Sequence, residues 1–171
     1  MDEELFLIDS NSLMTPHLTY YPFDFAEGFW EQMEDYIATG RIVILDVVKD
    51  EVLKGKDSLQ EWMEGLNIGT FVDHREASII GKYSEILQYI QNNPVYQPAA
   101  LAEWSRGTVA DPWLIATAAV QGYTVVSFET ENKGLNERTP SKKAKIPDVA
   151  KEFGVEVKNL YYMMRELNFK L

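Results

Sequence analysis

The chain has 171 residues, of which 46% are hydrophobic, a net charge of −11 at pH 7 and no cysteine. This length suits one good core and no apolar run approaches the ~20 residues of a membrane span, so we expect a single cytoplasmic domain over residues 1–171, with no membrane helix and no signal peptide. The absence of cysteine excludes disulfides, thiolate zinc sites and a cysteine nucleophile, and the negative charge argues against tight nonspecific binding of nucleic acid by the whole surface.

The first marked feature is an apolar run, Leu5 to Ile8, that stops abruptly at Asp9, Ser10 and Asn11. The run predicts a buried parallel strand that delivers Asp9 to the carboxyl edge of a sheet. In open α/β sheets the ligand crevice lies just outside that edge. Asp9 is therefore a candidate site residue, although a turn or helix cap would use the same residue types.

The next segments alternate between helix and strand patterns. Residues 12–22 look irregular and aromatic, and residues 23–39 predict an amphipathic helix. Its apolar positions are Phe25, Phe29, Met33, Tyr36 and Ile37. A buried strand over 42–45 and a helix over about 47–54 follow, and this second helix carries Glu51.

The middle of the chain reads as helical. One helix contains Leu59, Trp62, Met63 and Leu66. A long helix is predicted from His74 to Asn93, where Asn93-Pro94 ends it, and a short one around 99–104.

A second marked unit surrounds Asp111. Asp111 followed by Pro112 is a strong helix start signal, and Gly122 supplies the stop. The simplest interpretation of Asp111 is a cap worth about 1 kcal/mol. The strand that follows, over 123–127, also ends in a polar residue and an acid, Glu129. Two acids at strand ends and one at a helix start can thus converge on one sheet edge.

The remaining segments complete an alternating pattern: a short helix over 145–154, a strand over 155–157 and a terminal helix over 159–167. Strands that alternate with helices favour parallel pairing. We therefore predict a three-layer α/β/α fold with a central, mostly parallel sheet.

Basic residues crowd into one stretch, namely Lys133, Arg138, Lys142, Lys143 and Lys145. A basic loop beside an acidic metal cleft would suit a nucleic-acid phosphodiester, because the metal bridges the like-charged carboxylates and phosphate. A loop that merely remains solvated is the alternative.

With these motifs the chain resembles the PIN-domain family of metal-dependent nucleases, in particular bacterial stand-alone proteins of the VapC toxin type. The resemblance spans nearly the whole chain. It rests on the segments Phe6-Leu7-Ile8-Asp9-Ser10-Asn11, Val47 to Leu53, Ala110 to Ala118, Val125 to Glu129 and Lys145 to Val149.

The resemblance implies four acids in the active site: Asp9, Glu51, Asp111 and Glu129. PIN nucleases commonly end the last strand in Thr or Ser, one residue, and then Asp. Here the longer glutamate takes that place, and Glu131 and Asp50 stay open as alternative ligands. Asn11 and Ser127 match polar positions that support the acids in relatives.

The same resemblance implies Mg²⁺ or Mn²⁺ as cofactor and endoribonuclease activity by two-metal-type hydrolysis. Hard divalent ions prefer oxygen ligands, which agrees with four carboxylates. Arg138, Lys142, Lys143 and Lys145 become candidates for RNA binding. A cognate antitoxin and a homodimer are also implied. Candidates for the antitoxin contact are Tyr20, Tyr21, Phe23 and Trp30, which pack in the core under the alternative interpretation.

Two other classes remain. The chain could be a binding or regulatory protein with this fold and a weak or lost metal site, for which the departure at Glu129 leaves room. A receiver-like or haloacid-dehalogenase-like protein phosphorylated on Asp9 fits poorly, because the latter needs a second acid where Asn11 stands.

Overall fold

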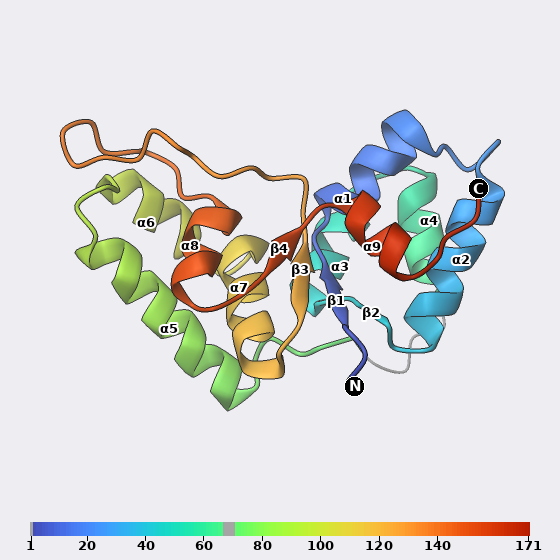
Figure 1. Cartoon of the computed structure of the whole chain (residues 1–171), viewed down its shortest axis with the longest axis horizontal. Helices are drawn as coiled ribbons and strands as arrows, with labels where there is room; N and C mark the ends of the chain where they lie inside the picture. The colour runs from blue at the N-terminus through green and yellow to red at the C-terminus, as the bar shows by residue number, and fades with distance from the viewer. Residues whose placement is uncertain (1, 67–70) are drawn as a thin grey trace.

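The computed structural model describes residues 2–66 and 71–171 and has a parallel four-stranded sheet at its centre (Figure 1). The strand order is β2-β1-β3-β4, and every neighbouring pair is parallel. The strands are β1 (Phe6–Ile8), β2 (Ile42–Val43), β3 (Thr124–Val126) and β4 (Val157–Lys158).

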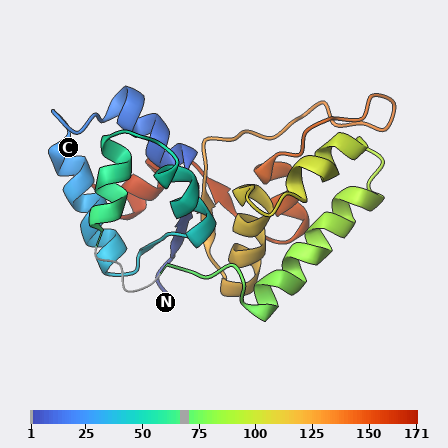
Figure 2. The same ribbon diagram turned by 180° about the vertical axis from the view of Figure 1, so that it is seen from behind.

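Helices connect and cover these short strands. In chain order the helices are α1 (Asn11–Thr15), the π-helix η1 (Pro16–Tyr20), α2 (Glu27–Ala38), α3 (Asp46–Leu53), α4 (Ser58–Gly65), α5 (Ala77–Asn92), α6 (Pro98–Trp104), α7 (Ala110–Gln121), α8 (Ile146–Glu152) and α9 (Leu160–Glu166). Figures 1 and 2 show α5, α6, α7 and α8 on one side of the sheet and α1, α2, α4 and α9 on the other. Helices on both sides of a parallel sheet make three layers, which confirms the predicted fold class.

The strand register places the ends of β1 and β3 next to each other. Phe6 pairs with Thr124 and Ile8 with Val126. On its other edge β1 pairs with β2, so successive crossovers leave β1 in opposite directions. Ligand crevices in open parallel sheets form at such a switch point, outside the carboxyl ends of the strands. Asp9 lies directly after β1 at this point.

The core is continuous across the sheet, and α7 is its most buried helix. The β1 side chains are fully buried, as are Leu114, Ile115 and Ala116 of α7. This helix packs against both β3 and α5, which explains why its sequence is apolar on nearly all sides. Burial of α7 fixes the position of Asp111 in its first turn.

The expectation of an irregular segment over 12–22 was wrong, because α1 and η1 make most of it helical. Leu13 is fully buried, and Ser12 Oγ donates a hydrogen bond to the carbonyl of Val126 at 3.2 Å. Pro16 follows α1 directly and begins η1, and the backbone stays helical through Thr15 and Pro16. The proline removes one N–H donor from this continuous helical run. Tertiary contacts therefore stabilise a helical segment that the polar residues and the proline in the sequence did not predict.

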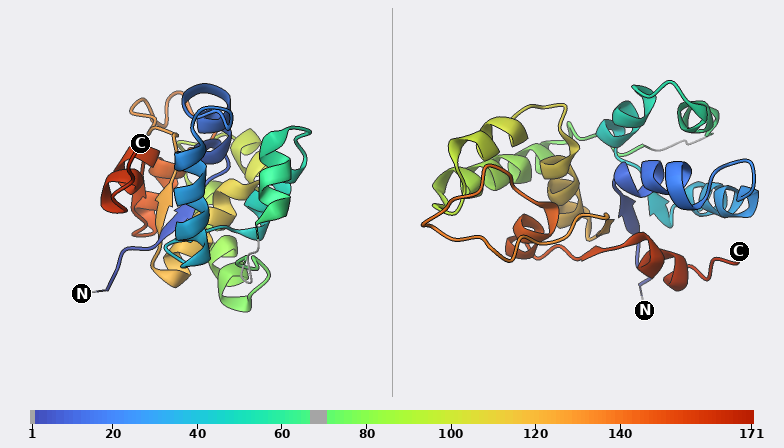
Figure 3. Two further views of the ribbon diagram at one scale, coloured as in Figure 1. Left: turned by 90° about the vertical axis from the view of Figure 1, so that its right-hand side faces the viewer. Right: turned by 90° about the horizontal axis from the view of Figure 1, so that it is seen from above.

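The helix predicted over 23–39 begins later, at Glu27. Phe25 precedes it and is 73% exposed, so it does not belong to the apolar face. Trp30 contributes to that face instead, with its Nε1 donating to the carbonyl of Tyr21 at 2.7 Å. Seen from above in Figure 3, this helix and α4 lie at the end of the molecule opposite α5 and α6.

No helix in the described ranges is both long and apolar enough to span a membrane, as predicted.

Candidate functional site

Asp9 lies buried at the carboxyl end of β1, beside the end of β3. Its side chain is almost inaccessible, with the residue 4% exposed. The backbone N–H of Asp9 extends the strand pairing by donating to the carbonyl of Val126 at 2.9 Å. Ser127 Oγ donates to Oδ2 of Asp9 at 2.8 Å. The aspartate is therefore held by the neighbouring strand.

Ser10 connects Asp9 to Glu51. The Ser10 hydroxyl lies 2.6 Å from Oε2 of Glu51 and 3.5 Å from Oδ1 of Asp9. Glu51 projects from α3, which begins one residue earlier than predicted. The sequence motifs do not single out Ser10 as a site residue; the signal for it is its place between Asp9 and Asn11 in the polar strand end.

Asn11 and Ser127 hold the turn that carries Glu129. Asn11 Nδ2 donates to Ser127 Oγ at 3.2 Å, and its Oδ1 accepts from the N–H of Phe128 at 3.2 Å. The N–H of Glu129 donates to Ser127 Oγ at 3.1 Å. Ser127 thus contacts Asp9 directly, and Asn11 contacts Ser127 and the residue that precedes Glu129.

Asp111 does not cap its helix, which corrects the simplest interpretation of this residue. The cap position of α7 is Val109, and the helix begins at Ala110, so Asp111 lies inside the first turn. Glu51 Oε1 instead accepts a long hydrogen bond, 3.4 Å, from the N–H of Ala110. The Glu51 carboxylate therefore lies at the amino end of α7, and the Asp111 side chain does not cap this helix.

The charges of Glu51 and Glu129 lie close enough to Asp9 and Asp111 to raise the pKa values of these two aspartates. Burial raises the pKa of Asp9 to about 7; the hydrogen bond from Ser127 opposes this rise, and the charges of Glu129 and Glu51 add to it. Burial also raises the pKa of Asp111 to about 8, and Glu129 is the largest charge contribution, followed by Asp9 and Glu51. Carboxylates that disfavour one another's ionised form mark a site where a cation would be favourable.

Glu129 is a better candidate for the fourth acid of this group than Glu131 or Asp50, the two predicted alternatives. Its Oε2 accepts a hydrogen bond of 2.8 Å from the N–H of Ile146 at the start of α8. Glu131 is exposed and instead raises the pKa of Asp148, while Asp50 is exposed on α3.

The donor set suits a hard divalent ion in chemistry, since it consists of carboxylate oxygens with serine and asparagine groups around them. Among the described residues, one group places three possible ligand atoms within 4.8 Å of one another. This group is Asp46, Asp73 and His74, and it contains none of the four predicted acids. The four predicted acids are more widely spaced, so ion binding would draw their side chains together.

The Asp46 group was not expected, because Asp46 and His74 are 28 positions apart. Its atoms already have partners: His74 Nδ1 lies 2.7 Å from Oδ2 of Asp46, and Arg75 donates to both oxygens of Asp73. The His74 ring also packs edge-on against Trp113 of α7, with centroids 4.7 Å apart. These contacts join the start of α3 to α7, close to Asp111 in sequence.

The basic stretch forms a long loop that leaves β3 and returns to Glu129 at Ile146 (Figure 1). Paired backbone bonds tie its middle to the segment before α6: Ser141 donates to Val95 at 2.7 Å, and Gln97 donates to Ser141 at 2.8 Å. The predicted RNA-binding side chains are distributed along it, with Arg138, Lys142 and Lys143 exposed and Lys145 half-buried beside α8.

Of the aromatic residues expected to contact a partner, Trp30 is buried at 3% exposure and belongs to the core. Tyr21 and Phe23 are half-buried, and Tyr20 is 47% exposed. Exposure thus leaves Tyr20 as the most accessible of the four.

Comparison with protein-family models matches residues 6–171 to a family described as a domain of unknown function, DUF4411. The chain belongs to the DUF4411 family. No curated protein matches it. The DUF4411 match covers the sheet, all four acids and the basic loop, so the whole candidate site lies within the family domain.

Proposed function

We propose that this DUF4411 domain is a divalent-metal-dependent endoribonuclease, and that it is the toxin of a toxin–antitoxin pair. The proposal extends the sequence resemblance to PIN nucleases with the arrangement of side chains described above.

One observation carries the proposal: carboxylates from four separate segments converge at the switch point of a parallel sheet. Asp9 follows β1, Glu51 lies on α3, Asp111 lies on α7, and Glu129 follows β3. Buried neighbouring acids destabilise a folded protein unless they are protonated or balanced by a cation. The pKa values of Asp9 and Asp111, about 7 and about 8, express this cost. Such an arrangement is expected where a function needs a cation.

In the proposed mechanism these four carboxylates would hold Mg²⁺ or Mn²⁺. When bound, such an ion lowers the pKa of a water molecule and stabilises negative charge on a phosphodiester. The protein's own groups orient the acids: Ser127 donates to Asp9, and Ser10 donates to Glu51. No side chain of the protein is required as a nucleophile.

The basic loop supports RNA as the substrate. Its exposed cations would attract a polyphosphate toward a site whose surroundings are acidic, since Lys and Arg supply most of the affinity for nucleic-acid backbones. A cognate antitoxin and a homodimer remain part of the proposal by resemblance alone.

The test is cleavage of a mixed tRNA and mRNA pool by purified protein with Mn²⁺. The parent is compared with an Asp9→Asn, Asp111→Asn double variant and with Asp50→Asn, which alters an exposed acid next to Glu51. Cutting by the parent and Asp50→Asn, with loss of about 100-fold or more in the double variant, would support the nuclease. Equal cutting by all three would reveal a contaminant, and no cutting by any would contradict the proposal.

A second candidate is a binding or regulatory domain without catalysis. Two observations favour it: the acids are more widely spaced than ligands around one ion, and one oxygen of Glu129 is engaged by the N–H of Ile146. Calorimetric titration with Mn²⁺ separates the candidates, because the binding domain predicts no heat that depends on Asp9 and Asp111.

A further inference from the structure

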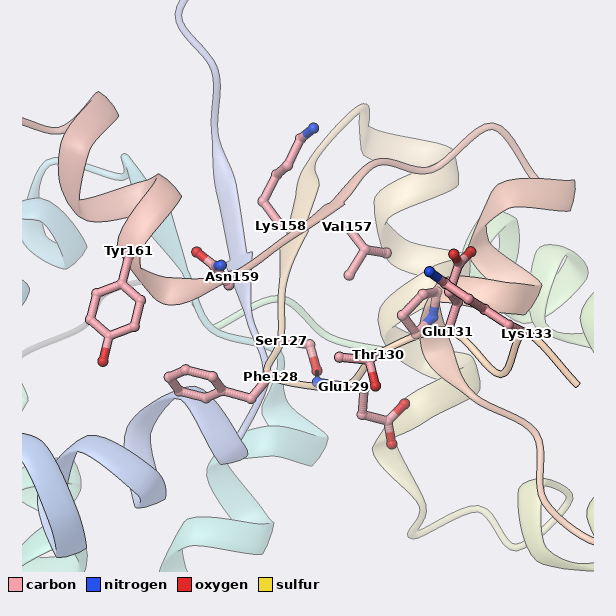
Figure 4. Close-up of a pocket in the computed structure, with 11 residues that line it drawn as sticks. Ser127, Phe128, Glu129, Thr130, Glu131, Lys133, Val157, Lys158, Asn159 and Tyr161 are labelled. Atoms are coloured by element: carbon pink, nitrogen blue, oxygen red, sulfur yellow. Dashed lines mark hydrogen bonds between the residues drawn. The ribbon is translucent and has the colours of Figure 1, made fainter.

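A cavity of about 680 Å³ opens beside the candidate site, between the carboxyl ends of β3 and β4 (Figure 4). Ser127 and Glu129 line it, so it shares two residues with the group around Asp9. Its volume falls in the range of pockets that bury small organic ligands, about 300–1,000 Å³. The side of the cavity away from Lys133 contains none of the four acids and no residue of the basic loop.

That other side is aromatic. Phe128 and Tyr161 line it with ring centroids 6.3 Å apart and planes at 75°. In Figure 4 both side chains lie on the same side of the pocket, away from Lys133. Tyr20 packs edge-on against Tyr161, again at 6.3 Å. Phe128 and Tyr161 are only half-buried, so they keep surface that a planar ligand can contact.

The opposite side is polar. Lys133 is exposed, and within the described ranges it forms no salt bridge. Thr130 and Glu131 lie on the same side as Lys133, whereas Asn159 lies toward Tyr161 (Figure 4). Lys158, the other lysine of the lining, forms an ion pair with Glu156 at 3.4 Å. A ligand that matches this cavity has a flat apolar part and an anionic part, which is the chemistry of a nucleotide.

The aromatic side is also fixed relative to the acids. The N–H of Phe128 donates to Asn11 Oδ1 at 3.2 Å, and Asn11 in turn donates to Ser127, the residue that holds Asp9. A base stacked on Phe128 would therefore have a defined position with respect to the carboxylates.

We propose that this cavity binds one unpaired nucleotide of a single-stranded RNA, next to the phosphodiester that the acids would cut. The base stacks on Phe128 and meets the Tyr161 ring edge-on, because the two ring planes stand at 75°, and Lys133 binds a backbone phosphate. Bases inside a duplex are already stacked and paired, so the cavity selects single-stranded segments. This inference rests on the proposed function for its cleavage step, but the binding step stands alone.

The experiment measures binding of a fluorescent hexauridylate by anisotropy, in EDTA, to the full chain. Phe128→Leu and Tyr161→Leu remove a ring face while retaining apolar bulk, and each should weaken binding roughly tenfold. Tyr161→Phe keeps the ring and should bind within about twofold of the parent. The matched control is Tyr123→Leu, a half-buried tyrosine just before β3, at the opposite edge of the sheet, which should leave binding unchanged. Lys133→Ala should weaken binding and reduce its salt dependence, whereas Lys56→Ala, another exposed lysine, should not.

The outcomes separate this inference from the proposed function. Ring-dependent binding without any cleavage would support the cavity and contradict the nuclease. Cleavage with hexauridylate affinities that do not differ between the parent and both leucine variants would overturn the cavity and leave the nuclease in place. Equal affinity for hexauridylate and for a 12-base-pair RNA duplex would also overturn it, as would no measurable affinity for either RNA.

Discussion

At the scale of single residues, Asp111 lies in an environment that disfavours its charged form. Its pKa, about 8, is raised first by burial and then by Glu129, Asp9 and Glu51. No helix cap compensates, because the cap position belongs to Val109. A residue in this position is expected to reduce stability in exchange for function.

Replacing Asp111 by Asn should therefore stabilise the protein in EDTA at pH 8. The folded chain holds the protons of Asp9 and Asp111 up to about pH 7 and 8, whereas the unfolded chain releases them near pH 3.8, so the parent loses stability as the pH rises between these values. The Asn variant lacks one of these groups, so its free energy of unfolding should fall less than that of the parent between pH 5 and pH 8. The difference should be a few kcal/mol at most, since one pKa unit corresponds to about 1.4 kcal/mol.

Urea unfolding at pH 5 and pH 8 measures this difference. Asp50→Asn, an exposed acid on α3, is the control and should follow the parent. A variant that is less stable than the parent at pH 8 would indicate that Asp111 has a structural role after all.

Ser127 offers a second prediction at this scale. Its hydroxyl donates to Oδ2 of Asp9 and lowers the pKa of that carboxyl against the effect of burial. Ser127→Ala should raise the pKa of Asp9 further, by about one unit, as expected for a hydrogen bond to a charged group. Carboxyl-carbon NMR titration of the metal-free protein checks it. Ser105→Ala, which alters an exposed serine after α6, should leave the pKa of Asp9 unchanged. An unchanged pKa of Asp9 in Ser127→Ala would contradict the hydrogen bond from Ser127 to Asp9.

At the scale of elements, α7 is positioned by both its ends. Glu51 meets its first N–H group, and Gly122 ends it in the left-handed conformation with φ of +78°. A Cβ at Gly122 would meet no atom within 4 Å, so any cost of a side chain there is conformational.

Gly122→Ala should consequently destabilise the fold by about 1 kcal/mol, the usual cost of placing an L-residue in that region. Thermal unfolding measures the loss. Gly107→Ala is the matched control, because Gly107 also has open space and lacks a positive φ. An equal loss in both variants would mean that the backbone angle is not the cause.

At the scale of the whole molecule, charge is divided between an acidic body and one basic loop. The net charge is −11, and yet five basic residues lie between positions 133 and 145. A cation bound among the acids would reduce repulsion in the folded state and has no matching site in the unfolded chain. Its binding energy should therefore appear as stability.

Mn²⁺ should raise the free energy of unfolding of the parent by about 2.7 kcal/mol at 100 times its Kd. The Asp9→Asn, Asp111→Asn variant should show almost none of this gain, and EDTA should abolish it in the parent. Calorimetric melting with and without Mn²⁺ provides the measurement. An equal gain in both proteins would place the ion elsewhere, for which Asp46, Asp73 and His74 are the next group to alter.

The sequence by itself determined the fold class and the chain segments that carry the acids. Apolar runs that end in polar residues located Asp9 and Glu129, and the Asp-Pro start signal located Asp111 within one residue of its helix boundary. These features are local: side-chain periodicity and strand ends depend on residues a few positions apart.

Only the tertiary structure decided which residues meet. The contact from Ser10 to Glu51 spans 41 positions, that from Ser127 to Asp9 spans 118, and the segment 12–22 became helical because Leu13 and Ser12 found partners in the core. The cavity beside Phe128 likewise needs β3, β4 and α9 to be in place. Pairing and burial are properties of the packed chain, so the pKa values of the acids could be assigned only once their neighbours were known.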